Sequence, residues 1–203
     1  KLIVKGSEIM IICILEEKLM NDVYKVCPIY KNNLITLRQT ILSDAAELLK
    51  CYSNKNSVPF FNSDNCHGDD FHYTSIERMK QAIEFWNYSY INRYFVRWTI
   101  ITNSTNEIIG TIEMFHRIAE DDFNHYGVLR IDLNSDYENQ KYIDAILGIV
   151  NESFYSLFNV KSILTKAFPT AKERLISLKK NGYIPLGRKF MIYNDYAVRT
   201  IVD

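Results

Sequence analysis

Three β-rich runs follow one another in the middle of the chain, and they restrict the fold more than any other feature. Tyr94 to Thr102 and Glu107 to Phe115 are joined by the turn residues Asn103 to Asn106, and Val128 to Leu133 comes next. A connection this short suits a hairpin, whereas parallel strands need a crossover of about a dozen residues or more. The sequence therefore predicts an antiparallel meander at the centre of the fold.

Amphipathic helices flank this meander. Thr74 and Glu77 form a capping box, and apolar residues then recur at spacings of three and four as far as Tyr90. Thr170 and Glu173 form another capping box before the last helix. The predicted helices cover residues 43–52, 74–90, 143–158 and 170–181. Further strands are predicted at residues 34–39, 160–167, 183–187 and 195–202.

The order of these elements predicts an α/β fold, with a mixed sheet and helices on both of its faces. With 203 residues the chain suits a single core, and we place the domain at residues 33–203. Residues 1–32 are predicted to form an N-terminal extension. In that extension apolar residues recur at threes and fours from Ile11 to Val26, which predicts a helix that ends at Pro28.

Charge and cysteine content limit the classes of function. Lys plus Arg and Asp plus Glu number 24 each, so no net field draws the protein to nucleic acid or to an anionic membrane. The apolar run from Ile9 to Leu15 is too short to span a bilayer. The cysteines show no C-x-x-C spacing, which predicts free thiols in the reducing environment of the cytoplasm.

Four segments resemble a known family in their order and in their local sequence. They are Leu34 to Leu49, Trp98 to Glu113, Leu129 to Leu147 and Phe168 to Tyr183. Together they resemble the GNAT superfamily of N-acetyltransferases, in particular the branch of ribosomal-protein N-terminal acetyltransferases. The resemblance implies the GNAT acyl-CoA N-acyltransferase fold with a mostly antiparallel central sheet. It also implies acetyl-CoA as co-substrate and a primary amine of a protein N-terminus or a small molecule as acceptor, and it leaves room for a homodimer.

The resemblance places a cofactor loop between the third strand of the meander and the helix that follows. In the family a Q/R-x-x-G-x-G/A loop brings helix N-terminal amides to the pyrophosphate. Glu138, Lys141 and Ile143 occupy its defined positions in this chain. These side chains are expected to repel and obstruct a pyrophosphate, while Lys141 could also pair with a phosphate. The cofactor-binding residues that the resemblance implies are Ile131, Leu133, Asn139, Gln140, Lys141, Tyr142 and Ile143.

Two carboxylates are candidates for the group that takes a proton from the acceptor amine. Glu113 and Asp132 lie on adjacent predicted strands, where their side chains can face one cleft. The alternative is that each is an exposed strand residue or an ion-pair partner. By resemblance, an amide near Leu133 would bind the acetyl carbonyl. No general acid can be identified, because Leu178 stands where many relatives carry a tyrosine.

The Asn- and Asp-rich segment 53–73 predicts a long loop with one helical turn. Its Cys66, His67 and His72 match no zinc-ligand spacing, so no metal site is predicted. Its acidic residues could attract a cationic amine, or they could be solvated surface. Aromatic residues could wall an acceptor cleft, although a core position is the alternative for Trp86. These aromatic residues are Phe60, Phe61, Phe71, Trp86 and Trp98.

Three classes of function stay open on the sequence. The first is an acetyltransferase for a protein N-terminus or a small amine, which the resemblance favours. The second is a GNAT-like binding or regulatory module without catalysis, which the altered loop from Glu138 to Ile143 favours. The third is a related acyltransferase that uses a different CoA thioester.

Overall fold

The computed structural model describes residues 22–201, and one sheet of eight strands runs through this part of the chain. The strand order is β1-β2-β3-β4-β5-β6-β8-β7. In this sheet β5 and β6 pair in parallel, and every other pair of neighbours is antiparallel. The predicted mixed, mostly antiparallel sheet is therefore confirmed. The strands are β1 (Tyr30–Lys31), β2 (Ile35–Gln39), β3 (Val96–Thr102), β4 (Ile108–His116), β5 (Gly127–Leu133), β6 (Ser162–Lys166), β7 (Ile184–Pro185) and β8 (Tyr196–Thr200).

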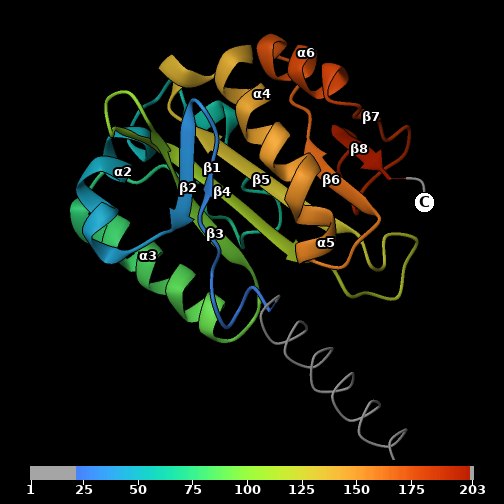
Figure 1. Cartoon of the computed structure of the whole chain (residues 1–203), viewed down its shortest axis with the longest axis horizontal. Coiled ribbons are helices and arrows are strands. Elements are labelled where there is room, and N and C mark those ends of the chain that lie inside the picture. The colour runs from blue at the N-terminus through green and yellow to red at the C-terminus, as the bar shows by residue number, and fades with distance from the viewer. Residues whose placement is uncertain (1–21, 202–203) are drawn as a thin grey trace, which may run out of the picture.

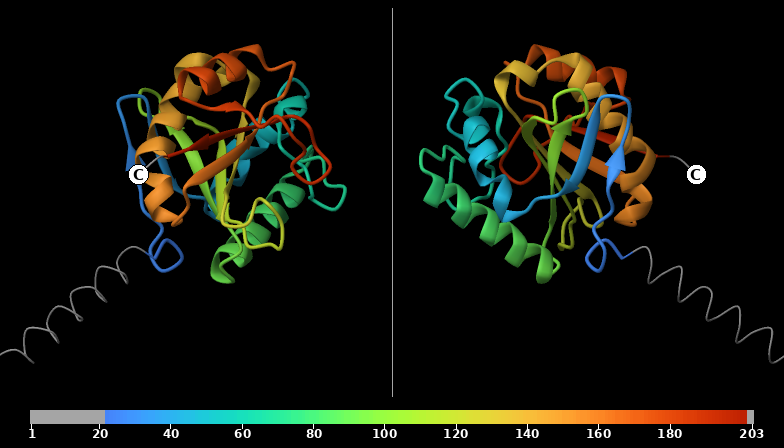
Figure 2. Two further views of the ribbon diagram at one scale, coloured as in Figure 1. Left: turned by 90° about the vertical axis from the view of Figure 1, so that its right-hand side faces the viewer. Right: turned by 60° about the vertical axis from the view of Figure 1, so that its left-hand side comes forward.

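Helices cover both faces of this sheet, as predicted. One face carries α2 and α3, and the other carries α4, α5 and α6 (Figure 1). Figure 2 shows the same layers from two other sides. The helices are α2 (Ala45–Tyr52), α3 (Ile76–Ile91), α4 (Gln140–Ile149), α5 (Tyr155–Leu157) and α6 (Lys172–Lys180), with a π-helical turn at Val150–Phe154 between α4 and α5. Short 3-10 turns occur at Leu42–Asp44, Val58–Phe60 and Ser135–Tyr137.

The alternation of side chains along the central strands separates an apolar face from a polar one. Trp98, Ile112 and Ile131 point toward α4 and belong to the main core. Residues one position away point to the other face, because successive side chains of a strand alternate. Arg97 and Glu113 are among them, and they lie beneath α2 and α3. The fold therefore holds charged side chains inside the molecule, on the α2/α3 face.

Two helices begin at different residues from those that the capping boxes predict. The N-cap of α3 is Ser75, whose hydroxyl accepts a hydrogen bond from the amide of Arg78 at 3.1 Å. The N-cap of α6 is Ala171, which has no side-chain acceptor, so Thr170 lies one residue too early to cap this helix. Both predicted helices exist, but the N-cap of each lies one residue later than the capping box predicts.

The last predicted strands are shorter than expected. The strand predicted at residues 183–187 is reduced to Ile184–Pro185, which lies at the edge of the sheet. Proline cannot donate a hydrogen bond to a strand ladder and is confined to edges or strand ends, which explains the early end of β7.

Gly110 lies where β4 and β5 approach each other closely. Its φ is +150°, and a Cβ atom would lie 2.0 Å from the Asp132 carbonyl oxygen. Only glycine permits this close approach of β4 to β5.

Residues 22–32 contact the sheet, although the sequence places them in an N-terminal extension. Val23 is buried in the main core, Tyr30–Lys31 pairs with β2, and the Trp98 indole donates to the Pro28 carbonyl at 3.0 Å. Residues 23–26 form turns, so the predicted helix does not reach Val26. The rest of that helix lies outside the described residues. From residue 22 to residue 201, no helix has both the length and the apolar character that a bilayer crossing requires.

Candidate active site

Four charged side chains meet on the α2/α3 face, three of them buried and Arg130 partly exposed, and we call Arg97, Glu113, Arg130 and Asp132 the charge cluster. Arg97 lies at its centre, with Nη2 2.5 Å from Glu113 Oε2 and Nη1 3.1 Å from Asp132 Oδ2. Arg130 Nη1 lies 3.1 Å from Glu113 Oε1. The side chains of Arg97, Glu113 and Asp132 are each 1% exposed. The cluster contains two positive and two negative charges, so its formal charge is balanced.

A buried cluster of this kind is expensive, because each ion gives up its hydration at a cost of several kcal/mol. Part of this cost appears as a shift in the pKa of Asp132. Burial raises the pKa of Asp132 above its usual range, although the positive charge of Arg97 opposes the rise. The Tyr52 hydroxyl, whose own pKa is raised well above its ordinary value by burial, stays protonated and donates to Asp132 Oδ2 at 3.1 Å. Such perturbed groups in one place are typical of functional sites.

Both predicted proton acceptors belong to this cluster. Across β4 and β5, Glu113 pairs with Arg130 and Thr111 pairs with Asp132, so the two carboxylates lie on the same face. Neither is an exposed strand residue, which was one of the alternatives, and both are ion-pair partners. Their catalytic role stays a prediction. Arg97 and Arg130 were not among the predicted site residues, although each stands at the strand position that alternation assigns to the polar face.

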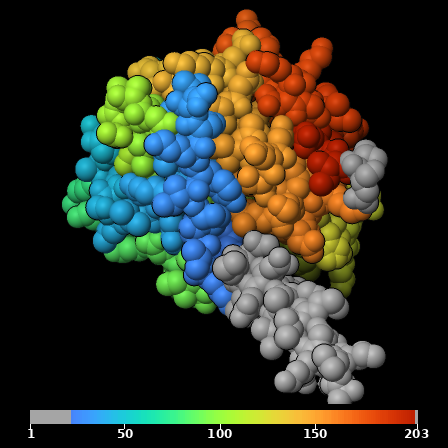
Figure 3. Space-filling view, in the orientation of Figure 1, coloured from blue at the N-terminus to red at the C-terminus, as the bar shows by residue number. Residues whose placement is uncertain are grey.

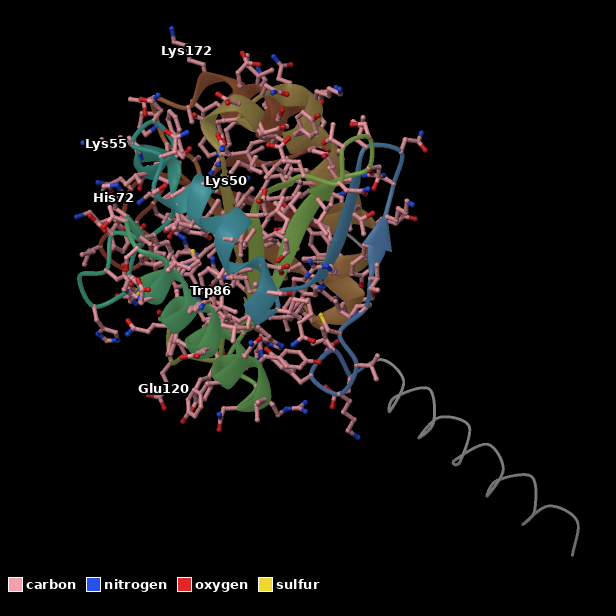
Figure 4. The ribbon with its side chains drawn as sticks, turned by 90° about the vertical axis from the view of Figure 1, so that its left-hand side faces the viewer. Lys50, Lys55, His72, Trp86, Glu120 and Lys172 are labelled. Carbon is pink, nitrogen blue, oxygen red and sulfur yellow. The ribbon has the colours of Figure 1, made fainter. Side chains whose placement is uncertain are left out.

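A cavity of about 340 Å³ opens beside the charge cluster, and we call it the aromatic pocket. Arg97, Glu113 and Arg130 line its inner end, while α3 and residues 65–73 supply its walls. Trp86 and Phe71, two of the aromatic residues proposed for the cleft, line it. Figure 4 looks onto this side of the molecule and labels Trp86 on α3.

The other aromatic candidates lie elsewhere. Trp98 is in the main core on the opposite face, Phe61 packs on Tyr52, and Phe60 contacts Phe168. None of these three lines the aromatic pocket. In the described part of the chain, no three His, Cys, Asp or Glu side chains are grouped as metal ligands.

The strands β5 and β6 part immediately next to the charge cluster. They pair only from Gly127 to Leu129, so Arg130 is the first residue of β5 beyond the pairing. The amide of Asn134 donates to the Ile109 carbonyl on β4 at 2.8 Å. Since hydrogen-bonded residues alternate in an antiparallel pair, the amides of Ile131 and Leu133 point away from β4, toward the side that β6 has left. Their side chains remain in the core.

The helix α4 begins beyond this opening, and its first amides are candidates for phosphate binding. Asn139 caps the helix and accepts a hydrogen bond from the Tyr142 amide at 3.4 Å. The amides of Gln140 and Lys141 stand in the first turn, where no intrahelical acceptor exists. Ile143 is fully buried in the main core. It therefore does not obstruct the loop, contrary to the expectation from the sequence.

Glu138, in the loop before α4, is neutralised by an arginine on α6. Arg174 on α6 donates through Nε and Nη2 to the two carboxylate oxygens at 2.7 and 2.6 Å, and both side chains are almost fully buried. Arg174 Nη1 also donates to the Phe60 carbonyl at 3.2 Å. The expected repulsion between Glu138 and a phosphate is thus offset by a paired cation. Sequence reasoning missed Arg174, because residues 36 positions apart meet here through the packing of α4 on α6 (Figure 3).

Comparison with known proteins places this geometry in a described fold. No protein-family model matches the chain. An uncharacterised N-acetyltransferase of Bacillus subtilis, YoaA, is 30% identical over 93 residues, which are 46% of this chain and 48% of that protein. The chain thus matches about half the length of this curated relative.

Solved structures show the fold over a larger share of the chain. A GNAT-family acetyltransferase from Bacillus anthracis superimposes with a TM-score of 0.65 over 85% of this chain and 98% of its own, at 13% identity. A ribosomal-protein-S5-alanine acetyltransferase from Vibrio fischeri gives 0.61 over 85% and 96%, at 16% identity. The chain has the GNAT acetyltransferase fold, and the resemblance predicted from the sequence is confirmed. The named relatives are acetyltransferases, which supports the prediction of an acetyltransferase.

Proposed function

We propose that this chain is a cytoplasmic N-acetyltransferase that moves an acetyl group from acetyl-CoA directly to a primary amine of a protein N-terminus or a small molecule. The observation that carries the proposal is the opening between β5 and β6. It adjoins the first turn of α4, and Arg130, its first β5 residue, also lines the aromatic pocket. A thioester and an amine could therefore approach each other from two faces of the sheet. The free state of Cys27, Cys51 and Cys66 agrees with a reducing compartment.

The groups around the opening between β5 and β6 offer the hydrogen-bond donors that an acyl-CoA needs. The amides of Gln140 and Lys141 can hold a pyrophosphate at the start of α4, and the Lys141 side chain adds a charge at the surface. The Leu133 amide is oriented to hydrogen-bond the acetyl oxygen. When bound, acetyl-CoA supplies the acetyl group as an activated thioester.

Glu113 is proposed to take the proton that the amine releases. A carboxylate offers about four lone-pair positions, and the arginines occupy three of those on Glu113. The remaining position can accept a hydrogen bond from an amine in the aromatic pocket, which Glu113 lines. The amine nitrogen then forms its bond to the acetyl carbon, the bond from that carbon to sulfur breaks, and CoA leaves as its thiolate. Positioning of the two substrates supplies most of the rate enhancement.

Acetyl-CoA is expected to stabilise the folded protein. A ligand that binds only the folded state adds about 2.7 kcal/mol at a hundredfold excess over its dissociation constant. The measurement is thermal unfolding with and without millimolar acetyl-CoA, with adenosine as the control for the nucleoside alone. An unchanged melting temperature in acetyl-CoA would contradict the proposal.

A second candidate function is a GNAT-like module without catalysis, and the bridge from Arg174 to Glu138 and to the Phe60 carbonyl favours it. This bridge links α6, the loop before α4 and the segment after α2. It holds Arg174 near the helix start where a pyrophosphate is proposed. If the bridge cannot open, CoA does not bind there.

Replacement of Glu138 by glutamine separates the two functions. In the acetyltransferase, the variant should bind CoA about 10-fold more tightly, because Arg174 is released to a phosphate and a charged hydrogen bond contributes about 1.5–3 kcal/mol. Calorimetric titration with CoA measures the change. Asp144→Asn is the matched control, since Asp144 is partly exposed and also pairs with a cation of α6, the exposed Lys180. Equal affinity of wild type and Glu138→Gln would show that Arg174 does not contact the phosphates.

A further inference from the structure

The aromatic pocket has aromatic walls, a polar side formed by residues 65–69 with Arg78, and a charged inner end. Trp86 and Phe71 are buried beside Arg97, with the guanidinium carbon 4.2 Å from the Trp86 ring and 5.7 Å from the Phe71 ring. Phe85 and Tyr94 also line the pocket, and each is 58% exposed. Large aromatic side chains left open to solvent around a cavity are typical of a surface that a ligand covers.

The arginine and carboxylate side chains that line this pocket are paired with one another. Arg97 and Arg130 pair with Glu113 at the inner end, and Arg78 pairs with Asp69 at the side. Asp132, on the side of Arg97 away from the pocket, pairs with Arg97 as well. The three arginines are therefore balanced by three carboxylates. A second charge on a bound molecule would therefore lose its hydration without gaining an unpaired partner, which is costly. An uncharged apolar body meets no such cost and gains from covering the aromatic walls.

The hydrogen-bond acceptor that lies nearest the opening between β5 and β6 is at the inner end of the pocket. There Glu113 retains one lone-pair position, and Arg130 marks the point where β5 leaves β6. An amine seated there would be adjacent to the opening from which the acetyl group is proposed to arrive. The rest of the molecule would extend outward between Trp86, Phe85 and Tyr94.

From this arrangement we propose that the acceptor is a primary amine carried on an uncharged aromatic or apolar body. The volume of about 340 Å³ lies at the small end of ligand pockets, which suits one aromatic group with its amine. The paired charges disfavour a polyamine, whose further ammonium groups would lose their hydration. The source is either a free arylalkylamine or a peptide whose N-terminal residue is aromatic. This inference deepens the proposed function and rests on it for the transfer step.

Calorimetric titration of the full chain tests the pocket without acetyl-CoA. The probes are phenethylamine, the dipeptide Phe-Ala with its C-terminus amidated so that it carries only one charge, and 1,4-diaminobutane. We expect phenethylamine or Phe-Ala to bind at least about 10-fold more tightly than the diamine. Tighter binding of phenethylamine identifies a free amine, and tighter binding of Phe-Ala identifies a peptide. Preference for the diamine overturns the inference.

Two variants of α3 supply the structural control. Phe85→Ala removes an exposed aromatic side chain of the pocket and should weaken phenethylamine binding by about 2- to 12-fold. Ile91→Ala removes an exposed apolar side chain of the same helix that does not line the pocket, and should leave binding unchanged. Equal losses in the two variants overturn the inference.

Transfer assays with acetyl-CoA distinguish this inference from the proposed function. Acetylation of the diamine in preference to phenethylamine and Phe-Ala would overturn the inference and leave the acetyltransferase standing. Binding of phenethylamine by a chain that binds no acetyl-CoA would overturn the acetyltransferase and leave the preference of the pocket in place.

Discussion

Replacing Arg97 by leucine is expected to lower the free energy of unfolding by about 3–5 kcal/mol, because removal of one partner leaves buried charge without compensation. Arg97 touches both carboxylates of the charge cluster, and Asp132 would keep hydrogen bonds only from Tyr52 and the Asn62 amide. Chemical denaturation at pH 7 measures the loss. Arg93→Leu is the control, since Arg93 pairs with Asp22 at the surface and its loss should cost about 1 kcal/mol or less.

The loss in Arg97→Leu should shrink in acid. Burial already raises the pKa of Asp132 in the folded wild type, and removal of the cation that opposes this rise moves the pKa higher. A carboxyl group whose pKa is higher in the folded than in the unfolded state contributes its full stability below the unfolded pKa, and this contribution is lost as pH rises through the folded pKa. The difference from wild type should therefore be smaller at pH 5 than at pH 7. A difference that grows on acidification would contradict the electrostatic account.

The fold could be predicted because its sequence signals are local. Turn residues between β-rich runs specify β3 and β4, and apolar residues at helical spacing specify α3 and α4. Ile143 also begins the apolar stripe of the helix predicted over residues 143–158, and in the structure this stripe faces the core. The expectation that Ile143 obstructs a phosphate came from the family loop instead, and it was wrong because the stripe turns the side chain inward.

The candidate site was only half predictable, because its contacts depend on registers and packing that a single sequence does not specify. Alternation puts Glu113 and Asp132 on one face, but the ion pairs of Arg97 with both carboxylates depend on the register of β3, β4 and β5. The pair of Glu138 and Arg174 depends on the packing of α6 against the start of α4. As a result, the sequence suggested an unpaired anion beside the cofactor, whereas the structure contains a buried ion pair.

Glu113→Gln is expected to lower the catalytic rate by roughly 100-fold or more at neutral pH, which is the range that a positioned general base contributes. Glutamine keeps the shape of the side chain and can still accept from Arg97, but it cannot take a proton. The loss should be smaller at high pH, where more of the acceptor amine is neutral and needs no base. The measurement is the pH profile of the rate of acetyl transfer for wild type and variant.

Two controls separate this effect from damage to the charge cluster. Glu107→Gln makes the same chemical change at an exposed position near the start of β4 and should leave the rate unchanged. Denaturation of Glu113→Gln at each pH reports whether enough protein stays folded, and the rate is then expressed per folded molecule. A deficit that stays constant across the pH range would assign Glu113 to positioning, since loss of a base must be relieved once the amine has lost its proton. An unchanged rate at neutral pH would exclude Glu113 from both roles and leave Asp132 as the remaining predicted proton acceptor.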